Sequence, residues 1–269
     1  MTVDIDYDFI SLELGEDPDS THLTYRRRDN FLEGFSTDFK IIMNILQQPN
    51  LEEFKILLFG ATIYDMEAFK NISEELLQVK FLTLCDYSEK GMLDILPIFD
   101  PLTLVGLTLD GVAMDDDDEE MDDDDGSGYR SGPLNINLRE IVELDQWKMS
   151  EYIEIDGFYV NPDVENFTHF TEAKVLMERV DETDISEIRD KMLQKFNDLT
   201  LEIKSKLIFD DLDEKFGEPL VIDGEENWYF RSPEKQILWL KISESTVMFQ
   251  YHDLSSVPEN AVIIECTKE

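Results

Sequence analysis

The chain has 269 residues, 42% of them hydrophobic and 11% aromatic, which is enough apolar surface for a buried core. Its 62 acidic and 23 basic residues give a net charge of −39, which argues against nucleic acid and anionic membrane as partners, because proteins bind both through lysine and arginine. No apolar run approaches the roughly 18 residues of a membrane span. The N-terminal MTVDIDYDF has neither the basic nor the apolar region of a secretory signal, and two cysteines, Cys85 and Cys266, make no disulfide framework. We therefore expect a cytoplasmic protein, with the nucleus as the alternative.

Residues 9–14 and 22–27 alternate in the manner of two strands of a β-hairpin, joined by the turn GEDPDS. Helices are predicted over 32–47 and 65–77, where apolar residues recur every three or four positions. Because the first unit of a repeat stack needs a cap over its core, we expect the hairpin to provide that N-terminal cap.

Six copies of one apolar pattern, Φ-x-x-Φ-x-Φ, follow along the chain. They are Leu51/Phe54/Ile56, Val79/Leu82/Leu84, Leu104/Leu107/Leu109, Ser150/Ile153/Ile155, Phe170/Ala173/Val175 and Phe196/Leu199/Leu201. Their spacing of 20 to 28 residues, apart from one gap of 46, is typical of leucine-rich repeats. The pattern predicts an α/β fold, a leucine-rich-repeat-like solenoid with a parallel sheet.

The gap of 46 residues contains the segment 112–131, which has no periodicity and includes the run DDDDEEMDDDD at 115–125. Because like charges repel one another, we predict a disordered acidic insertion loop between two repeats. Without the ten acids of this run the net charge is still −29 (−39 + 10), so the acidity belongs to the whole chain.

Helices with capping residues at their starts are expected around the later repeats. One runs from Asn137, with Glu140 three residues on, and another from Asp181, with Asp184 three residues on. Further along, the runs NWYFRS, QILWLKIS and TVMFQYH predict three antiparallel strands that form a C-terminal β cap. We expect Trp147 and Trp228 to be core residues, whereas the pattern leaves the side of Trp239 open.

Motifs for catalysis are absent from the sequence: it contains no G-x-S-x-G, no glycine-rich phosphate loop and no H-E-x-x-H. Its histidines, His22, His169 and His252, are far apart, and two cysteines with scattered histidines do not supply the four close ligands of a zinc site. We expect no catalytic residue, cofactor or metal, and hence no enzyme. Cys85 is expected on the exposed face of the sheet.

The repeat pattern also predicts a binding face. Residues between and just after the last two apolar positions of each copy point away from the core, toward the concave face of a curved stack. These candidate protein-binding residues are Lys55, Leu57, Thr83, Cys85, Thr108, Asp110, Glu154, Asp156, Lys174, Leu176, Thr200 and Glu202. Their mixture of threonines, acids, lysines and leucines favours a protein partner; the alternative is a solvated face without one.

The second half of the chain carries more specific marks. They are Leu144-Asp145-Gln146-Trp147-Lys148, Ile155-Asp156-Gly157-Phe158, Glu165-Asn166-Phe167-Thr168-His169-Phe170, Phe216-Gly217-Glu218-Pro219, Trp228-Tyr229-Phe230-Arg231 and the tail 257–265. On these marks the sequence resembles the FTH domain of nematode F-box-associated proteins, from about residue 20 to the end, and we treat 1–269 as a single FTH-like repeat domain.

The resemblance implies a protein-recognition module, because FTH domains are thought to select targets for cullin-RING ubiquitin ligases beside an F-box. The first 20 residues show no helices of an F-box. We therefore expect a monomeric target-recognition domain without an evident F-box, linked to a ligase only indirectly. The alternative is an acidic decoy that binds basic proteins, such as histones or nucleic-acid-binding proteins, through its charge.

Overall fold

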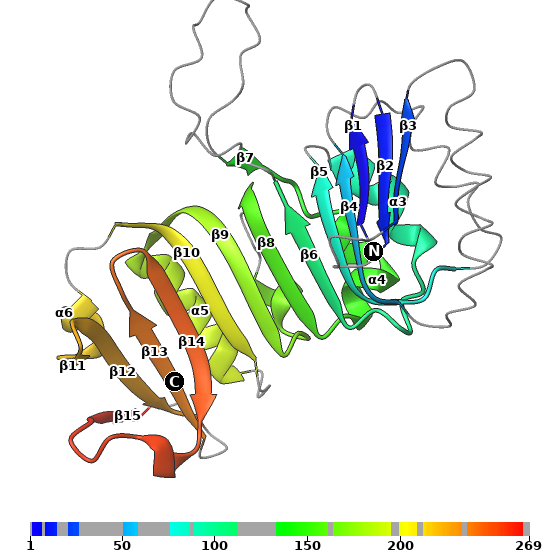
Figure 1. The fold of residues 1–269 in the computed structure, drawn as a ribbon. Helices are drawn as coiled ribbons and strands as arrows, with labels where there is room; N and C mark the ends of the chain where they lie inside the picture. Colours follow the sequence, from blue (N-terminus) through cyan, green and yellow to red (C-terminus); the bar gives the residue numbers. More distant parts are fainter. Residues whose placement is uncertain are drawn as a thin grey trace, which may run out of the picture. The chain divides into compact units, whose positions relative to one another are not determined.

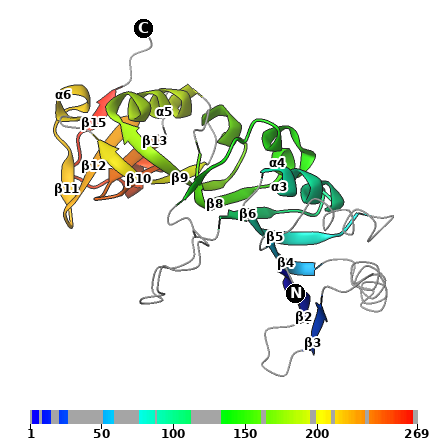
Figure 2. The ribbon, with the colours of Figure 1, turned by 90° about the horizontal axis from the view of Figure 1, so that it is seen from above.

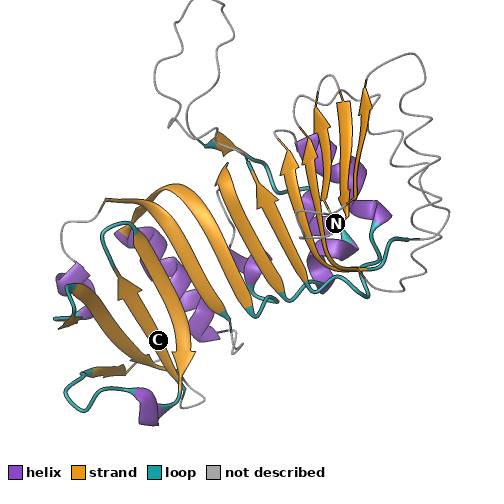
Figure 3. Ribbon diagram, in the orientation of Figure 1, coloured by secondary structure: helices purple, strands orange, loops and turns teal. Residues whose placement is uncertain are grey.

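Two compact units make up the chain: Met1–Ser150 with Ile155–Phe158, and Glu151–Glu154 with Tyr159–Glu269. The structure, a computed structural model, describes residues 2–6, 9–14, 21–26, 51–58, 76–86, 89–111, 133–160, 164–194, 199–208, 212–232 and 236–265. Each unit is mixed α/β, with a large sheet and few helices (Figure 3), which confirms the predicted class. The count of one domain and the solenoid remain predictions.

The sheet of the first unit has the strand order β3–β2–β1–β4–β5–β6 (Figure 1). Its strands are β1 (Thr2–Asp6), β2 (Phe9–Leu14), β3 (Thr21–Arg26), β4 (Leu51–Leu58), β5 (Val79–Asp86) and β6 (Gly106–Asp110), and a short β7 (Leu134–Asn135) follows. Its helices are α3 (Glu89–Ile95), η1 (Leu96–Ile98), η2 (Ile141–Glu143) and α4 (Asp145–Met149). The strand β8 (Tyr152–Tyr159) contributes residues to both units.

The predicted N-terminal hairpin is confirmed as the antiparallel pair β2–β3. A strand that the sequence analysis missed, β1, lies between this hairpin and the first repeat strand: it pairs antiparallel with β2 and parallel with β4. The available signal was the alternation of Val3 and Ile5 with polar neighbours. The strand that adjoins the first repeat is therefore β1 and not the hairpin itself.

The repeated apolar positions of the first unit stand side by side across β4, β5 and β6. Phe54 pairs with Leu82 and Leu82 with Leu107, and the next row joins Ile56, Leu84 and Leu109. All six side chains are buried. Phe99, which follows η1, packs on this side with its ring 5.7 Å from that of Phe54. Burial of such a row is the main driving force for this half of the fold, at roughly 1.5–3 kcal/mol per large side chain.

The helix expected from Asn137 to Trp147 is wrong as a continuous element. Asn137 makes only a local bond, its side-chain oxygen accepting from the Arg139 N–H, and the chain then forms η2 and α4 with an extended residue, Leu144, between them. Trp147 is nevertheless buried as expected. The break at Leu144 separates η2 from the α4 turn that holds Trp147, so apolar spacing alone overestimated the length of the helix.

The sheet of the second unit has the strand order β8–β9–β10–β14–β13–β12–β11, and β15 also pairs with β12 (Figure 1). Its further strands are β9 (Glu172–Asp181), β10 (Thr200–Ile208), β11 (Leu220–Ile222), β12 (Glu225–Arg231), β13 (Ile237–Ile242), β14 (Thr246–His252) and β15 (Ile263–Glu265). Its helices are η3 (Val164–Phe167), α5 (Glu182–Gln194), α6 (Leu212–Phe216) and η4 (Leu254–Ser256).

Helix α5 begins as the sequence predicted. The Asp181 carboxylate accepts from the backbone N–H groups of Thr183 and Asp184, and Asp184 in turn accepts from the Asp181 N–H. These bonds satisfy donors that the first turn of a helix otherwise leaves unpaired, and they lower the pKa of Asp181. The helix lies along one side of β9 and β10 (Figure 2).

The predicted C-terminal antiparallel strands are confirmed as β12, β13 and β14, and β14 continues the sheet beside β10. One row runs across the second unit from β8 to β12 on the side of α5. It consists of Ile153, Ala173, Leu201, Phe249, Leu240 and Trp228, each paired with the next, and all are buried. Tyr251, on the same side of β14, donates its hydroxyl hydrogen to the Met192 carbonyl of α5. This side of the sheet is therefore the core.

Several predictions fall outside the described residues. The acidic loop 112–131 and the helix over 32–47 lie there entirely. So does the helix over 65–77, except at its end, where Leu77 forms a parallel bridge with Phe99.

Candidate protein-interaction face

The side of the second-unit sheet opposite to α5 carries a second row of paired residues. It consists of Glu154, Lys174, Glu202, Met248, Lys241 and Asn227, each paired with the next across β8, β9, β10, β14, β13 and β12. Because paired residues point to the same side of a sheet, these six side chains share one face, which we call the helix-free face. All are partly exposed except Asn227, which is buried.

In the first unit the structure places the predicted face residues in register. Lys55, Thr83 and Thr108 form one row across β4, β5 and β6. In the next row, the backbone of Leu57 is paired with that of Cys85, and Cys85 is paired with Asp110. The prediction that these positions of neighbouring strands stand side by side is therefore correct for all six residues of this unit.

The expectation that Cys85 is exposed is wrong. Its side chain is only 2% exposed, although it points away from Leu84 and the repeat core. Its Sγ lies 3.6 Å from an Asp110 carboxylate oxygen, within reach of a weak S–H donor. Strand alternation assigns Cys85 to the correct side but does not show that this side is covered at that point.

In the second unit the predicted columns are only partly correct. Glu154 pairs with Lys174 as expected, but Lys174 pairs with Glu202 and not with Thr200, which stands opposite Glu172. The last pattern copy is therefore offset by two residues relative to the fifth. The offset preserves the face of every side chain, because alternate residues of a strand share a face.

Asp156 is also displaced from its predicted neighbour. The register of β8 shifts between Glu154 and Tyr159, so that Tyr159 takes the place beside Leu176 that the pattern assigned to Asp156. Asp156 instead accepts a hydrogen bond on its carbonyl from the Gly111 N–H, at 2.8 Å within the first unit. We therefore remove Asp156 from the helix-free face of the second unit.

Two charged side chains at the β8–β9 end of the helix-free face are held by partners. The Tyr152 hydroxyl donates to the Glu154 carboxylate at 2.5 Å, and Lys174 pairs with Glu172 at 3.0 Å. Burial and this bond to Glu154 raise the pKa of Tyr152 to about 12, and the bond to Glu172 raises the pKa of Lys174. The Lys174 ammonium also lies 5.6 Å from the centre of the Tyr152 ring. Tyr152 thus contacts both Glu154 and Lys174 and helps to hold the two side chains in place.

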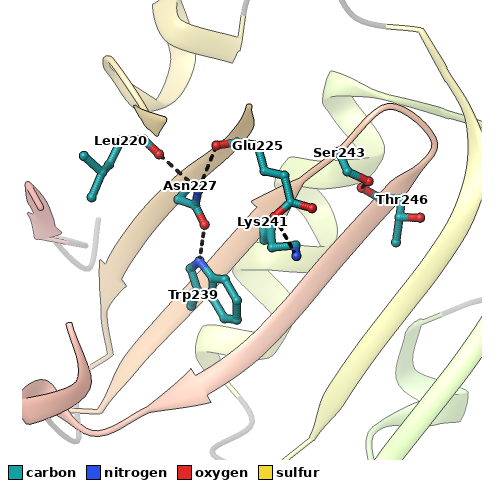
Figure 4. Close-up of polar contacts among 7 residues, drawn as sticks. All are labelled: Leu220, Glu225, Asn227, Trp239, Lys241, Ser243 and Thr246. Carbon is teal, nitrogen blue, oxygen red and sulfur yellow. Dashed lines mark hydrogen bonds and ion pairs between the residues drawn. The ribbon is translucent and has the colours of Figure 1, made fainter. Parts of the chain in front are cut away.

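The other end of the face holds an aromatic side chain with a fixed orientation (Figure 4). The Trp239 indole N–H donates to the Asn227 side-chain oxygen at 2.8 Å. The Asn227 amide group in turn donates to the Leu220 and Glu225 carbonyls. Lys241, beside Trp239 on β13, pairs with the Glu225 carboxylate at 2.8 Å. Ordering these groups in advance reduces the entropy lost when a partner binds.

The sequence analysis missed this end of the face, including Trp239, Lys241 and Met248. The strands themselves were predicted, and alternation with the buried Leu238 and Leu240 was a usable signal for Trp239. What the sequence could not supply was the pairing of β14 with β10, which aligns Met248 with Glu202. The His252 ring packs edge-on against the Trp239 ring, with the ring centres 4.8 Å apart. Burial lowers the pKa of His252.

Other kinds of site do not emerge from the part of the chain that the structure describes. No group of three or more histidine, cysteine, aspartate or glutamate side chains there is arranged to hold a metal ion. Within the same residues, no helix has the length and apolarity to cross a membrane.

Comparison with known proteins decides the family. The family model described as the FTH domain matches residues 64–217, which is more than half of the 269 residues. The chain belongs to the FTH domain family. No curated protein and no solved structure matches it.

The marks of the FTH domain are explained by structural roles. Gln146 donates to the Phe99 carbonyl at 2.7 Å beside the buried Trp147. Gly157 has a φ of +70°, and a Cβ there would lie 1.8 Å from the Gly111 carbonyl oxygen, so only glycine fits. Phe167 and Phe170 are buried against each other.

The mark that begins at Phe216 has the same character. The Phe216 ring packs edge-on against Trp228 and Phe230, and Arg189 of α5 lies over its face at 4.7 Å. The next residue, Gly217, accepts the Trp228 indole N–H on its carbonyl at 2.8 Å. These family marks therefore describe the core and its turns, and the helix-free face lies largely outside them.

Proposed function

We propose that this FTH domain is a non-catalytic protein-interaction module that binds its target through the helix-free face of the second unit. The observation that carries the proposal is the contrast between two adjacent rows of the same sheet. The row that includes Phe249 is buried on the side of α5, whereas the row that includes Met248 is partly exposed in all but one position. A sheet face with leucine, methionine and tryptophan among paired charges suits a protein partner.

The membership in the FTH family extends the proposal. We propose that the chain is a target-recognition domain related to those of F-box ubiquitin-ligase adaptors, with strand-and-return units stacked as in a leucine-rich-repeat solenoid. Its link to a cullin-RING ligase is then indirect and its working state monomeric. The support is the family match over residues 64–217 together with the repeated rows of buried residues.

A second function is favoured by a separate observation, the net charge of −39. A basic protein is steered toward such a chain without a shaped site. In this case the acidic run at 115–125 contributes to binding and the helix-free face does not.

The test is affinity capture from native lysate, at low and at high salt, with wild type, Leu176→Glu and Leu254→Glu. Leu254 is an exposed leucine of η4 and belongs to none of the paired rows of the helix-free face, so its replacement adds the same charge at another exposed site. We expect a partner that withstands high salt and is reduced at least about tenfold by Leu176→Glu only, since a charge at an interface core is costly.

The opposite pattern supports the charge decoy. In that pattern all partners wash off at high salt and are lost when Asp115–Asp125 are neutralised, and Leu176→Glu does not change their recovery. This result would contradict the helix-free face as the binding site. Recovery of cullin-RING subunits with the salt-resistant partner would support the ligase link.

A further inference from the structure

The outer edge of β12 in the second unit is a surface that the helix-free face does not include. Strand β13 pairs with β12 over Glu226–Arg231, so β11 and β15, which also pair with β12, must share the other edge. They lie there end to end, because Leu220 stands opposite Asn227 and Ile263 opposite Tyr229. We call β11 and β15, with the residues next to them, the outer edge.

The turn between β11 and β12 fixes which backbone groups of the outer edge are open. Asp223 and Gly224 have φ values of 54° and 87°, and the flanking pair is Ile222 with Glu225. Two positive φ values in a two-residue loop define a type I′ hairpin, whose flanking pair exchanges both backbone hydrogen bonds. Pairs alternate along an antiparallel ladder, so the N–H and C=O of Val221 point away from β12.

Apolar side chains surround these open backbone groups. Val221 is 60% exposed, Ile222 is 39% exposed, and Val262, next to β15, is 72% exposed. A strand edge with exposed β-branched residues is a natural place for another extended chain to pair. Pro219 has no N–H, so the ladder that such a chain can form here is short and centred on Val221.

The charges around the outer edge select the partner. Glu226, opposite Val221, and Asp213, in α6, have no ion-pair partner among the described residues, in contrast to Glu225 and Glu265, which pair with Lys241 and Arg231. Burial and the Asp213 charge raise the pKa of Glu226. A cation bound beside them would relieve this repulsion.

We propose that the outer edge binds an extended basic segment of another protein. The segment pairs with the backbone of Val221, covers Val221 and Val262 with an apolar side chain, and places a lysine or arginine beside Glu226 and Asp213. This surface is a second binding site, separate from the helix-free face. The proposal for it does not depend on the proposal for that face.

The experiment uses the full chain and a fluorescein-labelled peptide of alternating lysine and valine, KVKVKVK, titrated by fluorescence anisotropy at physiological salt. The deciding variant is Val221→Asp, with Leu254→Asp as the matched control at another exposed apolar site. Circular dichroism checks that both fold. Docking at the outer edge predicts binding at least about tenfold weaker for Val221→Asp alone, since it buries a charge in the contact. Attraction by charge predicts equal or tighter binding for both, because each adds a negative charge.

Two further arms sharpen the result. A peptide with N-methylated valines, which cannot donate from those positions, should lose affinity if a strand pairs with Val221. The pair of changes Asp213→Asn and Glu226→Gln should weaken the unmodified peptide several-fold. Equal binding by wild type and Val221→Asp, or no saturable binding below about 1 mM, overturns the proposal. Leu176→Glu should leave this titration unchanged, so failure here is distinct from failure of the helix-free face.

Discussion

The two sets of parallel strands in this protein share one apolar pattern, but the strand register agrees with the pattern in only one of them. In the first unit, the pattern copies on β4, β5 and β6 coincide with the observed register, so Phe54, Leu82 and Leu107 stand in one row. In the second unit, the copies on β9 and β10 are two residues out of step. A shift of two keeps every buried side chain buried, and a shift of one would not. The pattern therefore specifies the face of a residue and leaves its neighbour on the next strand open.

The largest expected effect concerns the two sides of β14. Phe249 lies in the buried row and Met248 in the partly exposed one. We expect Phe249→Ala to lower the free energy of unfolding by about 3–5 kcal/mol, through lost burial and the cavity left behind. Met248→Ala should cost less than about 1 kcal/mol. Urea unfolding at equilibrium measures both, and similar costs for the two would contradict the assignment of faces.

A second test addresses the bulge that separates Glu154 from Tyr159 on β8. Gly157→Ala should cost more than about 2 kcal/mol, because its positive φ and the contact with the Gly111 backbone both exclude a Cβ. Gly217→Ala is the control, since it has a similar φ of +82° with no atom within 4 Å of the added Cβ. It should cost only about 1 kcal/mol. If the two changes cost the same in urea unfolding, the close approach at Gly157 is wrong.

Two tyrosines on opposite sides of the second-unit sheet extend the comparison to pH. Burial raises the pKa of Tyr251 and that of Tyr152 from 10 to about 12. A raised pKa means that the folded state favours the protonated phenol, so its contribution to stability is complete below pH 10 and is lost as the pH rises from 10 to 12. Tyr251→Phe should cost about 0.5–1.5 kcal/mol at pH 8, through the lost bond to Met192.

The readout is urea unfolding at steps between pH 8 and 11.5. Tyr251→Phe should flatten the decline in stability at high pH, and Tyr152→Phe should flatten it less, because Tyr152 is less buried than Tyr251. An unchanged decline in Tyr251→Phe would show that other groups control it.

The smallest effect tests the register directly. A double-mutant cycle between Lys174 and Glu202, which are paired on β9 and β10, should give a coupling of about 0.2–1 kcal/mol. The same cycle between Lys174 and Thr200, the neighbour that the pattern predicted, should give none above experimental error. Unfolding free energies of the single and double alanine variants supply both couplings, and the reverse order would restore the predicted register.

The sequence by itself determined the class of fold, the buried side of the repeat strands, the family and the acidic character. Burial follows from local alternation, so Leu82, Ala173 and Leu201 could each be assigned to the core without their neighbours. The cap of α5 at Asp181 is equally local, because its hydrogen bonds span three residues.

Only the tertiary structure decided which residues meet. The pairing of β14 with β10, the bulge in β8 and the insertion of β1 beside β4 all join segments that are distant in the sequence. They depend on packing against particular partners, such as Gly111 against Gly157. Local propensity does not specify which distant segment a strand packs against. For that reason the helix-free face, with Trp239 at one end, and the open edge at Val221 became visible only once the strands were in place.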